Sequence, residues 1–148
     1  NADIALGSEQ WVSVHSHLEK STAAVFQELR EQGYTIVATS PHHNAYTPFN
    51  IPLNTKIALV MGTEKQGLET ESLNLADCCL YLPMVGFAES FNVSVSAALA
   101  LQPIMHRLRN SQQHIGLTEH EKLKLKIEWL IKSIRNGKSL ANAFLNNK

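Results

Sequence analysis

The chain has 148 residues, of which 44% are hydrophobic and 18% charged, a composition typical of a soluble globular domain and not of a disordered chain. No apolar run approaches the roughly 20 residues that a membrane-spanning helix needs, so we expect no membrane protein. The formal net charge is +0, but residues 1–104 hold four basic and ten acidic residues, whereas residues 105–148 hold nine basic and three acidic ones. The basic C-terminal third is typical either of a phosphate-binding surface or of a solvated helix face.

The N-terminal part of the chain predicts a short strand followed by a helix. Residues 11–17 partly alternate apolar and polar side chains, which indicates a strand with His15 and His17 on one face. No third metal ligand follows at a suitable spacing, so we predict a polar strand face and no metal site. A helix begins near residue 22, and Gly33 stands where its C-terminal cap belongs.

Three apolar segments predict buried strands: residues 34–40, which end before a proline, residues 57–61 and residues 78–82. The second is a short continuous apolar run, typical of a strand covered on both faces. The only cysteines, Cys78 and Cys79, are adjacent in the third, so we expect free thiols and a reducing, cytoplasmic setting. The connections are a loop with three prolines and a short helix, residues 41–54 and 68–76.

The remainder of the chain is predicted to be helical. A long helix over 92–110 contains Pro103, which should kink or shorten it by removing one backbone hydrogen bond. Apolar residues at helical spacing over 123–134 indicate a second helix that Gly137 should end, and 140–145 can form a short third one. The alternation of strands and helices predicts an α/β fold with a mostly parallel sheet flanked by helices.

A glycine-bounded motif, Gly62-Thr63-Glu64-Lys65-Gln66-Gly67, follows the second predicted strand. It lacks the Lys-Ser/Thr pair that follows the last glycine of a P-loop, which disfavours a P-loop NTPase. The glycines leave the backbone free to approach a ligand, and Glu64 between them suits an amino group, a ribose hydroxyl or a basic side chain. A plain surface turn is the alternative for this motif taken alone.

A second motif, Leu82-Pro83-Met84-Val85-Gly86, leads from the third predicted strand towards the long helix. A loop between a strand and a helix N-terminus is a frequent ligand site in α/β folds. Its backbone groups can hold a purine edge beside apolar side chains, among them Phe91. Ser90 and Asn92 add hydrogen-bonding groups at the helix start, where either one can equally serve as the helix cap.

Together, the two motifs resemble the second and third signature motifs of the SpoU-type (TrmH-like) RNA 2′-O-methyltransferases of the SPOUT superfamily. Gly62, Glu64 and Gly67 match the pattern Gly-x-Glu-x-x-Gly. Residues 82–97 match the pattern Ile/Leu-Pro-Met-x-Gly…Ser-Leu-Asn-Val-Ser-x-Ala, with Phe91 in place of the usual leucine. The resemblance covers about residues 8–110 well and the remainder only as a basic helical extension.

The resemblance implies transfer of a methyl group from S-adenosylmethionine to a ribose 2′-hydroxyl in tRNA or rRNA, by a homodimer with a C-terminal trefoil knot. The helix that begins at Asn92 would form the dimer interface. The implied cofactor contacts are Thr39, Gly62, Leu82, Met84, Gly86 and Phe91. The implied catalytic-pocket residues are Glu64, Ser90 and Asn92.

The expected organisation is a SpoU-type methyltransferase domain over residues 1–110 and a basic helical extension over 111–148. In the extension, Lys122, Lys126 and Lys132 are candidate RNA contacts because lysines near phosphates release counterions.

One departure from the family pattern concerns the activating group. The first family motif, Asn-x-x-x-x-x-Arg, carries an arginine proposed to help activate the 2′-hydroxyl, and it does not occur in this sequence. We therefore expect an N-terminal portion with a further strand to lie outside the sequence. The alternative function is a non-catalytic knotted RNA-binding relative that lacks this arginine.

Overall fold

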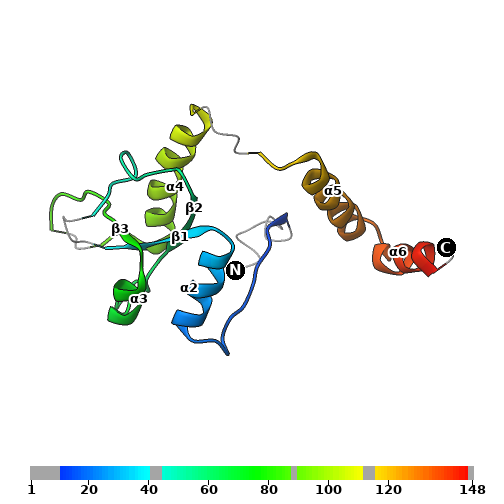
Figure 1. Cartoon of the computed structure of the whole chain (residues 1–148), viewed down its shortest axis with the longest axis horizontal. Helices are drawn as coiled ribbons and strands as arrows, with labels where there is room; N and C mark the ends of the chain where they lie inside the picture. Colours follow the sequence, from blue (N-terminus) through cyan, green and yellow to red (C-terminus); the bar gives the residue numbers. More distant parts are fainter. Residues whose placement is uncertain (1–10, 41–44, 88–89, 112–115, 147–148) are drawn as a thin grey trace. The chain divides into compact units, whose positions relative to one another are not determined.

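The computed structural model describes residues 11–40, 45–87, 90–111 and 116–146 (Figure 1). The chain divides into two compact units, His17–Gln113 and the pair of segments Asn1–Ser16 and His114–Lys148. None of the described helices is long and apolar enough to cross a membrane.

The larger unit is built on a parallel sheet. Its strands are β1 (Tyr34–Thr39), β2 (Lys56–Val60) and β3 (Cys78–Leu80), arranged in the order β2-β1-β3. Both neighbours run parallel to β1, with Val37 opposite Leu59 on one side and opposite Cys78 on the other. The three predicted buried strands are therefore present, and the parallel sheet flanked by helices is confirmed.

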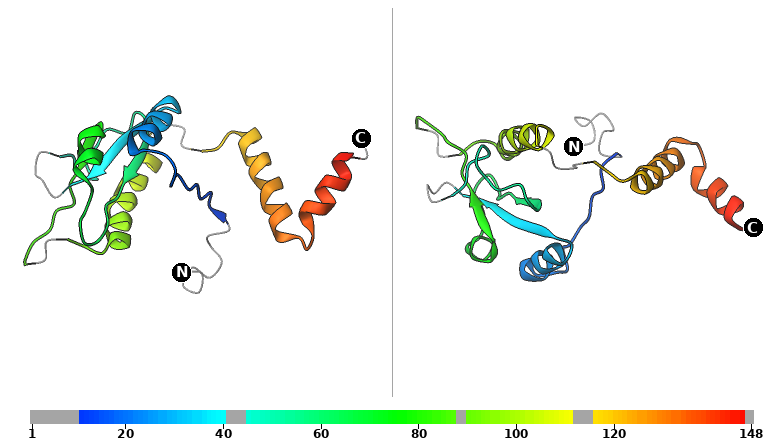
Figure 2. Two further views of the ribbon diagram at one scale, coloured as in Figure 1. Left: turned by 90° about the horizontal axis from the view of Figure 1, so that it is seen from below. Right: turned by 45° about the horizontal axis from the view of Figure 1, so that its top comes forward.

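Helices cover both faces of this sheet. On one side lies α4 (Val93–Arg109), and on the other lie α2 (Thr22–Glu31) and α3 (Thr70–Leu75) (Figure 2). The central strand is buried on both faces, as its continuous apolar run requires. Val37 packs in the cluster on the α4 side, together with Ile51, Leu80, Ala100 and Ile104.

The predicted ends of α2 are found at their expected residues. Ser21 caps α2 by accepting a hydrogen bond from the Ala24 N–H at 3.3 Å, and Gly33 follows the C-terminal cap with a φ of 82°. Pro103 was expected to kink or shorten α4, but the helix is not shortened, because it continues through Pro103 over 17 residues in all. The proline removes the donor for the Leu99 carbonyl, which lies on the exposed side of the helix, where water can replace it.

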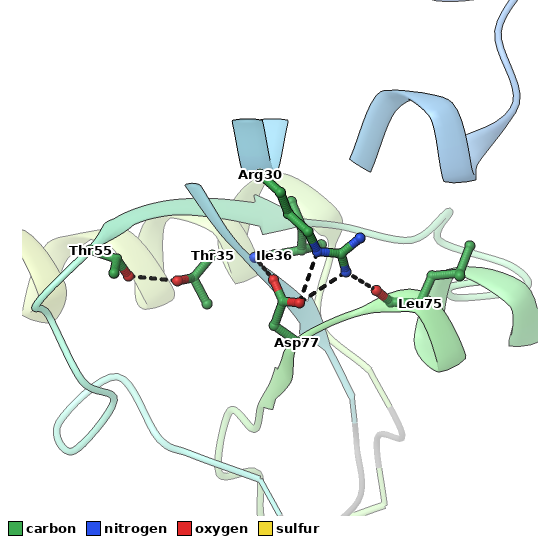
Figure 3. A network of polar contacts seen from close by, with 6 residues as sticks. All are labelled: Arg30, Thr35, Ile36, Thr55, Leu75 and Asp77. Atoms are coloured by element: carbon green, nitrogen blue, oxygen red, sulfur yellow. Dashed lines mark hydrogen bonds and ion pairs between the residues drawn. The ribbon is translucent and has the colours of Figure 1, made fainter. Parts of the chain in front are cut away.

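An ion pair between Arg30 and Asp77 links α2, α3 and β1 (Figure 3). The Arg30 guanidinium, at the end of α2, contacts the Asp77 carboxylate at 2.9 Å and also donates to the Leu75 carbonyl at the end of α3. The other Asp77 oxygen accepts from the Ile36 N–H of β1 at 2.7 Å. Burial alone would raise the pKa of Asp77, but the Ile36 N–H and the Arg30 guanidinium together lower it.

Two expectations about strands were wrong. Residues 11–17 form no strand and add nothing to the described sheet, and their side chains are exposed. A strand without a partner leaves its hydrogen-bonding groups to water. The second strand was expected to be covered on both faces, yet β2 lies at the edge of the sheet as described and is only half-buried.

The smaller unit contains α5 (Glu119–Ser133) and α6 (Gly137–Asn146). Thr118 and Glu121 form a reciprocal capping box at the start of α5. Gly137 was predicted to end this helix, but it begins α6 instead, and Asn136 makes the turn with a φ of 61°. A Cβ atom on Gly137 would meet the Ile131 carbonyl oxygen at 2.2 Å, so close approach of the backbone explains the glycine.

The N-terminal segment of the smaller unit contacts α5 through an aromatic pair. The rings of Trp11 and Trp129 meet edge to face with their centroids 5.5 Å apart. No residue of α5 is buried within the described structure.

The ion pair of Asp77 with Arg30 should make the free energy of unfolding depend on pH. Because folding lowers the pKa of Asp77, its stabilising contribution is complete above the pKa of the unfolded chain, about 4, and is lost as the pH falls through the folded value. We expect Asp77→Asn to lower the free energy of unfolding by about 1 kcal/mol at pH 7, because the pair is partly exposed, and by less at pH 3. Urea denaturation across this range measures it. Glu71→Gln, at an exposed carboxylate of α3, is the control, and an Asp77→Asn effect that is the same at both pH values would contradict the assignment.

Candidate functional site

The candidate site lies where the three parallel strands end. The carboxyl ends of parallel strands meet at one edge of the sheet, which is where α/β folds bind ligands. The segments that follow β1, β2 and β3 enclose a cavity of about 740 Å³ together with the start of α4. Its lining includes seven of the residues implied by the resemblance, namely Thr39, Gly62, Glu64, Leu82, Met84, Ser90 and Phe91.

The loop after β2 is closed on itself by backbone hydrogen bonds. The Thr63 N–H donates to the Gly67 carbonyl at 3.0 Å, and the Gly67 N–H donates to the Thr63 carbonyl at 2.9 Å. Gly67 needs its φ of 68° for this turn. A Cβ atom on Gly62 would lie 2.1 Å from the Gly67 carbonyl carbon, so any side chain there collides with the loop's own backbone.

Asn92 joins two parts of the site. Its Oδ1 caps α4 by accepting from the Ser94 N–H at 2.9 Å, and its Nδ2 donates to Glu64 Oε1 at 2.5 Å. This assignment of oxygen and nitrogen follows from the two partners, since a carboxylate accepts and an N–H donates. The cap and the predicted site role therefore coexist in one side chain.

Apolar side chains and one threonine complete the cavity. Leu82, Met84 and Phe91 belong to its lining, as does the fully buried Leu80. Thr39 donates its hydroxyl to the Val60 carbonyl at 3.1 Å, which links the ends of β1 and β2. The result is a partly apolar pocket with a small number of polar groups, as ligand sites usually are.

Two of the implied residues do not line the cavity. Asn92 acts through Glu64, as described above. Gly86 has a φ of 102°, and no heavy atom lies within 4 Å of the position that its Cβ would occupy, so its role here is the turn itself. Several other lining residues were not predicted from the sequence, including Ser40, Met61, Lys65 and Tyr81. Each of them lies within or next to a motif or strand end that was predicted, and this proximity in the sequence is the signal that could have identified them.

The three candidate RNA-contact lysines lie on α5, in the smaller unit. All three are exposed, as expected for a solvated helix face and for a phosphate-binding surface alike. Lys122 forms an ion pair with Glu119 at 2.7 Å, one turn away. An exposed pair at this spacing contributes only a few tenths of a kcal/mol, so it leaves Lys122 able to exchange partners.

Thiols and metal ligands contribute no further site. Cys78 and Cys79 are free and half-buried, and burial raises the pKa of the Cys78 thiol. A raised pKa disfavours the reactive thiolate. Across the described ranges, no group of three or more His, Cys, Asp or Glu residues is arranged to hold a metal ion.

The chain also matches a known protein family. Residues 1–102 match the model of the SpoU rRNA Methylase family. The chain belongs to this family. The resemblance predicted from the two motifs is therefore confirmed.

Individual relatives agree with the family match. The chain is 34% identical over 142 residues to the tRNA (guanosine(18)-2′-O)-methyltransferase of Borreliella burgdorferi, covering 96% of this chain and 64% of that relative. The TrmH/SpoU tRNA modifying enzyme of A. aeolicus superposes with a TM-score of 0.74 at 27% identity, covering 91% of this chain and 69% of the other.

A third relative was solved with a ligand. The SpoU methyltransferase AviRb from Streptomyces viridochromogenes, in complex with the cofactor AdoMet, has a TM-score of 0.51 at 25% identity, over 62% of this chain and 36% of that one. The chain thus spans less than two thirds of the curated Borreliella relative and of AviRb.

Gly62 and Gly67 should respond differently to the same substitution. In Gly62→Ala the new methyl group collides with the Gly67 backbone, so the loop must open, and we expect a loss of about 1–3 kcal/mol in the free energy of unfolding. Gly67→Ala meets no atom within 4 Å and costs only the left-handed backbone strain of about 1–2 kcal/mol. Urea denaturation, with amide exchange at Thr63 and Gly67, separates the two effects. Intact protection of both amides in Gly62→Ala would contradict the collision.

Proposed function

We propose that the chain transfers a methyl group from S-adenosylmethionine to a ribose 2′-hydroxyl of RNA. The observation that carries the proposal is the cavity at the strand ends, which brings residues of both signature motifs together in a member of the SpoU rRNA Methylase family. The Borreliella relative and AviRb are both named as methyltransferases, so the alternative of a non-catalytic RNA-binding relative gains no support from them.

The residues present fit the cofactor. A volume of about 740 Å³ lies within the range of small-molecule sites, roughly 300–1,000 Å³. Leu82, Met84 and Phe91 offer apolar walls to a purine ring, and the Gly62 backbone borders the cavity without a side chain. When bound, the cofactor supplies an electrophilic methyl group on its sulfonium centre.

The polar residues would place the ribose. Asn92 holds the Glu64 carboxylate in one position, and this carboxylate and Ser90 both line the cavity. A carboxylate oxygen can accept a hydrogen bond from a ribose hydroxyl and so fix the direction of its oxygen lone pairs. We assign Glu64, Ser90 and Asn92 to positioning the 2′-hydroxyl.

The substrate and the wider organisation are parts of the same proposal. A tRNA guanosine is the substrate favoured by the relatives' names, with rRNA as the alternative. We propose residues 1–110 as the methyltransferase domain with its trefoil knot, residues 111–148 as a basic extension, and a cytoplasmic location.

A homodimer through α4 is also part of the proposal. This helix exposes a set of apolar side chains away from its buried residues Ala100 and Ile104. The set consists of Val95, Leu99, Leu101 and Met105. Exposed apolar surface of this kind is a common feature of interfaces between subunits.

The cofactor assignment is tested by two phenylalanines of one segment. Phe91→Ala removes part of the cavity wall, and we expect it to raise the Kd for S-adenosylmethionine about tenfold by calorimetry. Phe87→Ala is the matched control, because Phe87 is fully exposed and does not line the cavity.

Transfer of a labelled methyl group to an unmodified tRNA transcript tests the activity itself. We expect slow transfer with the unaltered chain, because the first-motif arginine does not occur in it, and a further loss of about 100-fold or more in Glu64→Gln. Cofactor binding without any transfer would favour the non-catalytic alternative. A Kd for S-adenosylmethionine that is unchanged in Phe91→Ala would contradict the assignment of the cofactor to this cavity.

The proposed RNA contacts of the basic extension are tested by the salt dependence of tRNA binding. If Lys122, Lys126 and Lys132 bind phosphates, replacing all three with alanine should flatten the slope of log K against log salt for tRNA binding, by about 0.7–0.9 for each phosphate that is no longer neutralised. Cofactor affinity should stay unchanged, because these lysines lie outside both motifs. Lys56→Ala, at the amino end of β2, is the control. An unchanged slope would show that the three lysines form only a solvated helix face.

A further inference from the structure

Most basic residues of the larger unit already have partners. These are Lys20 with Glu28, Arg30 with Asp77, Lys56 over the Tyr34 ring, and Arg107 with the carbonyls of Pro48 and Ile51. Such contacts give each of these four cations a structural role. Arg109 lies at the far end of α4 from the cavity.

Lys65 differs from all of them. Among the described residues that line the cavity it is the single basic one, and it makes no hydrogen bond or ion pair with any described residue. The neighbouring Glu64 carboxylate is bound by the neutral amide of Asn92 and does not use the lysine charge. An ammonium group at a cavity, without a partner from the described part of the protein, is suited to an anionic group of the ligand.

The chemistry of the proposed acceptor says which anion this is. In RNA the 2′-hydroxyl and the 3′-phosphodiester are on neighbouring ribose carbons. A ribose whose 2′-oxygen lies at Glu64 therefore brings its 3′-phosphate to the same loop. Lys65 is the next residue of that loop after Glu64. The Glu64 carboxylate repels this phosphate, and the adjacent ammonium group offsets that repulsion.

The exposure of Lys65 favours the RNA phosphate, and not the carboxylate of the cofactor, as the anion that it binds. Lys65 is exposed, whereas Leu80 and Ser40, which line the same cavity, are buried. A charge at the open side suits the larger ligand, whose backbone continues into solvent. We infer that Lys65 binds the phosphate on the 3′ side of the nucleotide to be methylated, an inference that rests on the proposed function.

The test neutralises each partner of this contact in turn. The probes are a tRNA with ordinary phosphates and the same tRNA with one uncharged methylphosphonate linkage on the 3′ side of guanosine 18, the position given in the relative's name. Their Kd values are measured by fluorescence anisotropy for the unaltered chain, for Lys65→Gln and for the control Lys56→Gln. Calorimetry gives the Kd for S-adenosylmethionine in the same variants.

We expect the methylphosphonate to weaken binding about fivefold for the unaltered chain and for Lys56→Gln, the size of one exposed charge contact. Lys65→Gln should bind the ordinary tRNA about fivefold more weakly than the unaltered chain does. Its Kd should be the same for the ordinary tRNA and for the tRNA with the methylphosphonate. Lys65→Arg should keep most of the affinity.

Two results would overturn the inference. The first is a fivefold loss from the methylphosphonate that persists in Lys65→Gln, because independent effects show that the two groups do not meet. The second is a weaker Kd for S-adenosylmethionine in Lys65→Gln, which would assign the lysine to the cofactor. Coupled Kd values without any methyl transfer would instead reject the proposed activity and keep the phosphate contact.

Discussion

Parallel pairing of three strands is the constraint on which the rest of the larger unit depends. Because β2 and β3 both run parallel to β1, their carboxyl ends and the loops that follow must come to one edge of the sheet. Residues of the two motifs, about twenty positions apart in the chain, therefore share one cavity. An antiparallel neighbour would place one of these loops at the opposite edge, and no local feature of either motif could restore the site.

The elements that the sequence predicted well are those whose signals are local. The apolar run of β1, the capping serine before α2 and the capping asparagine before α4 each act within a few residues of their own position. Such interactions form in the same way whatever the rest of the chain does, which is why the bounds of these elements could be predicted closely. The same holds for the turn glycine that follows the Glu64 loop.

The failures concern properties that depend on a partner distant in sequence. Residues 11–17 have a strand-like pattern but are not part of the described sheet, and the pattern of β2 does not reveal that it lies at a sheet edge. Gly137 resembled a helix terminator, although its actual constraint is the approach of the Ile131 carbonyl. For the site, the motifs identified Glu64 and Asn92 separately, whereas the hydrogen bond between them became visible only in three dimensions.

The double role of Asn92 also limits how this position can vary in evolution. A capping oxygen and an amide donor are both required, and among the usual capping residues only asparagine has both on one short side chain. Aspartate would keep the cap but set a second carboxylate against Glu64, and serine would keep the cap but fall short of the carboxylate. A substitution at this residue must therefore preserve both the helix cap and the hydrogen bond to Glu64. An exchange that preserves only the cap would need a compensating change at Glu64.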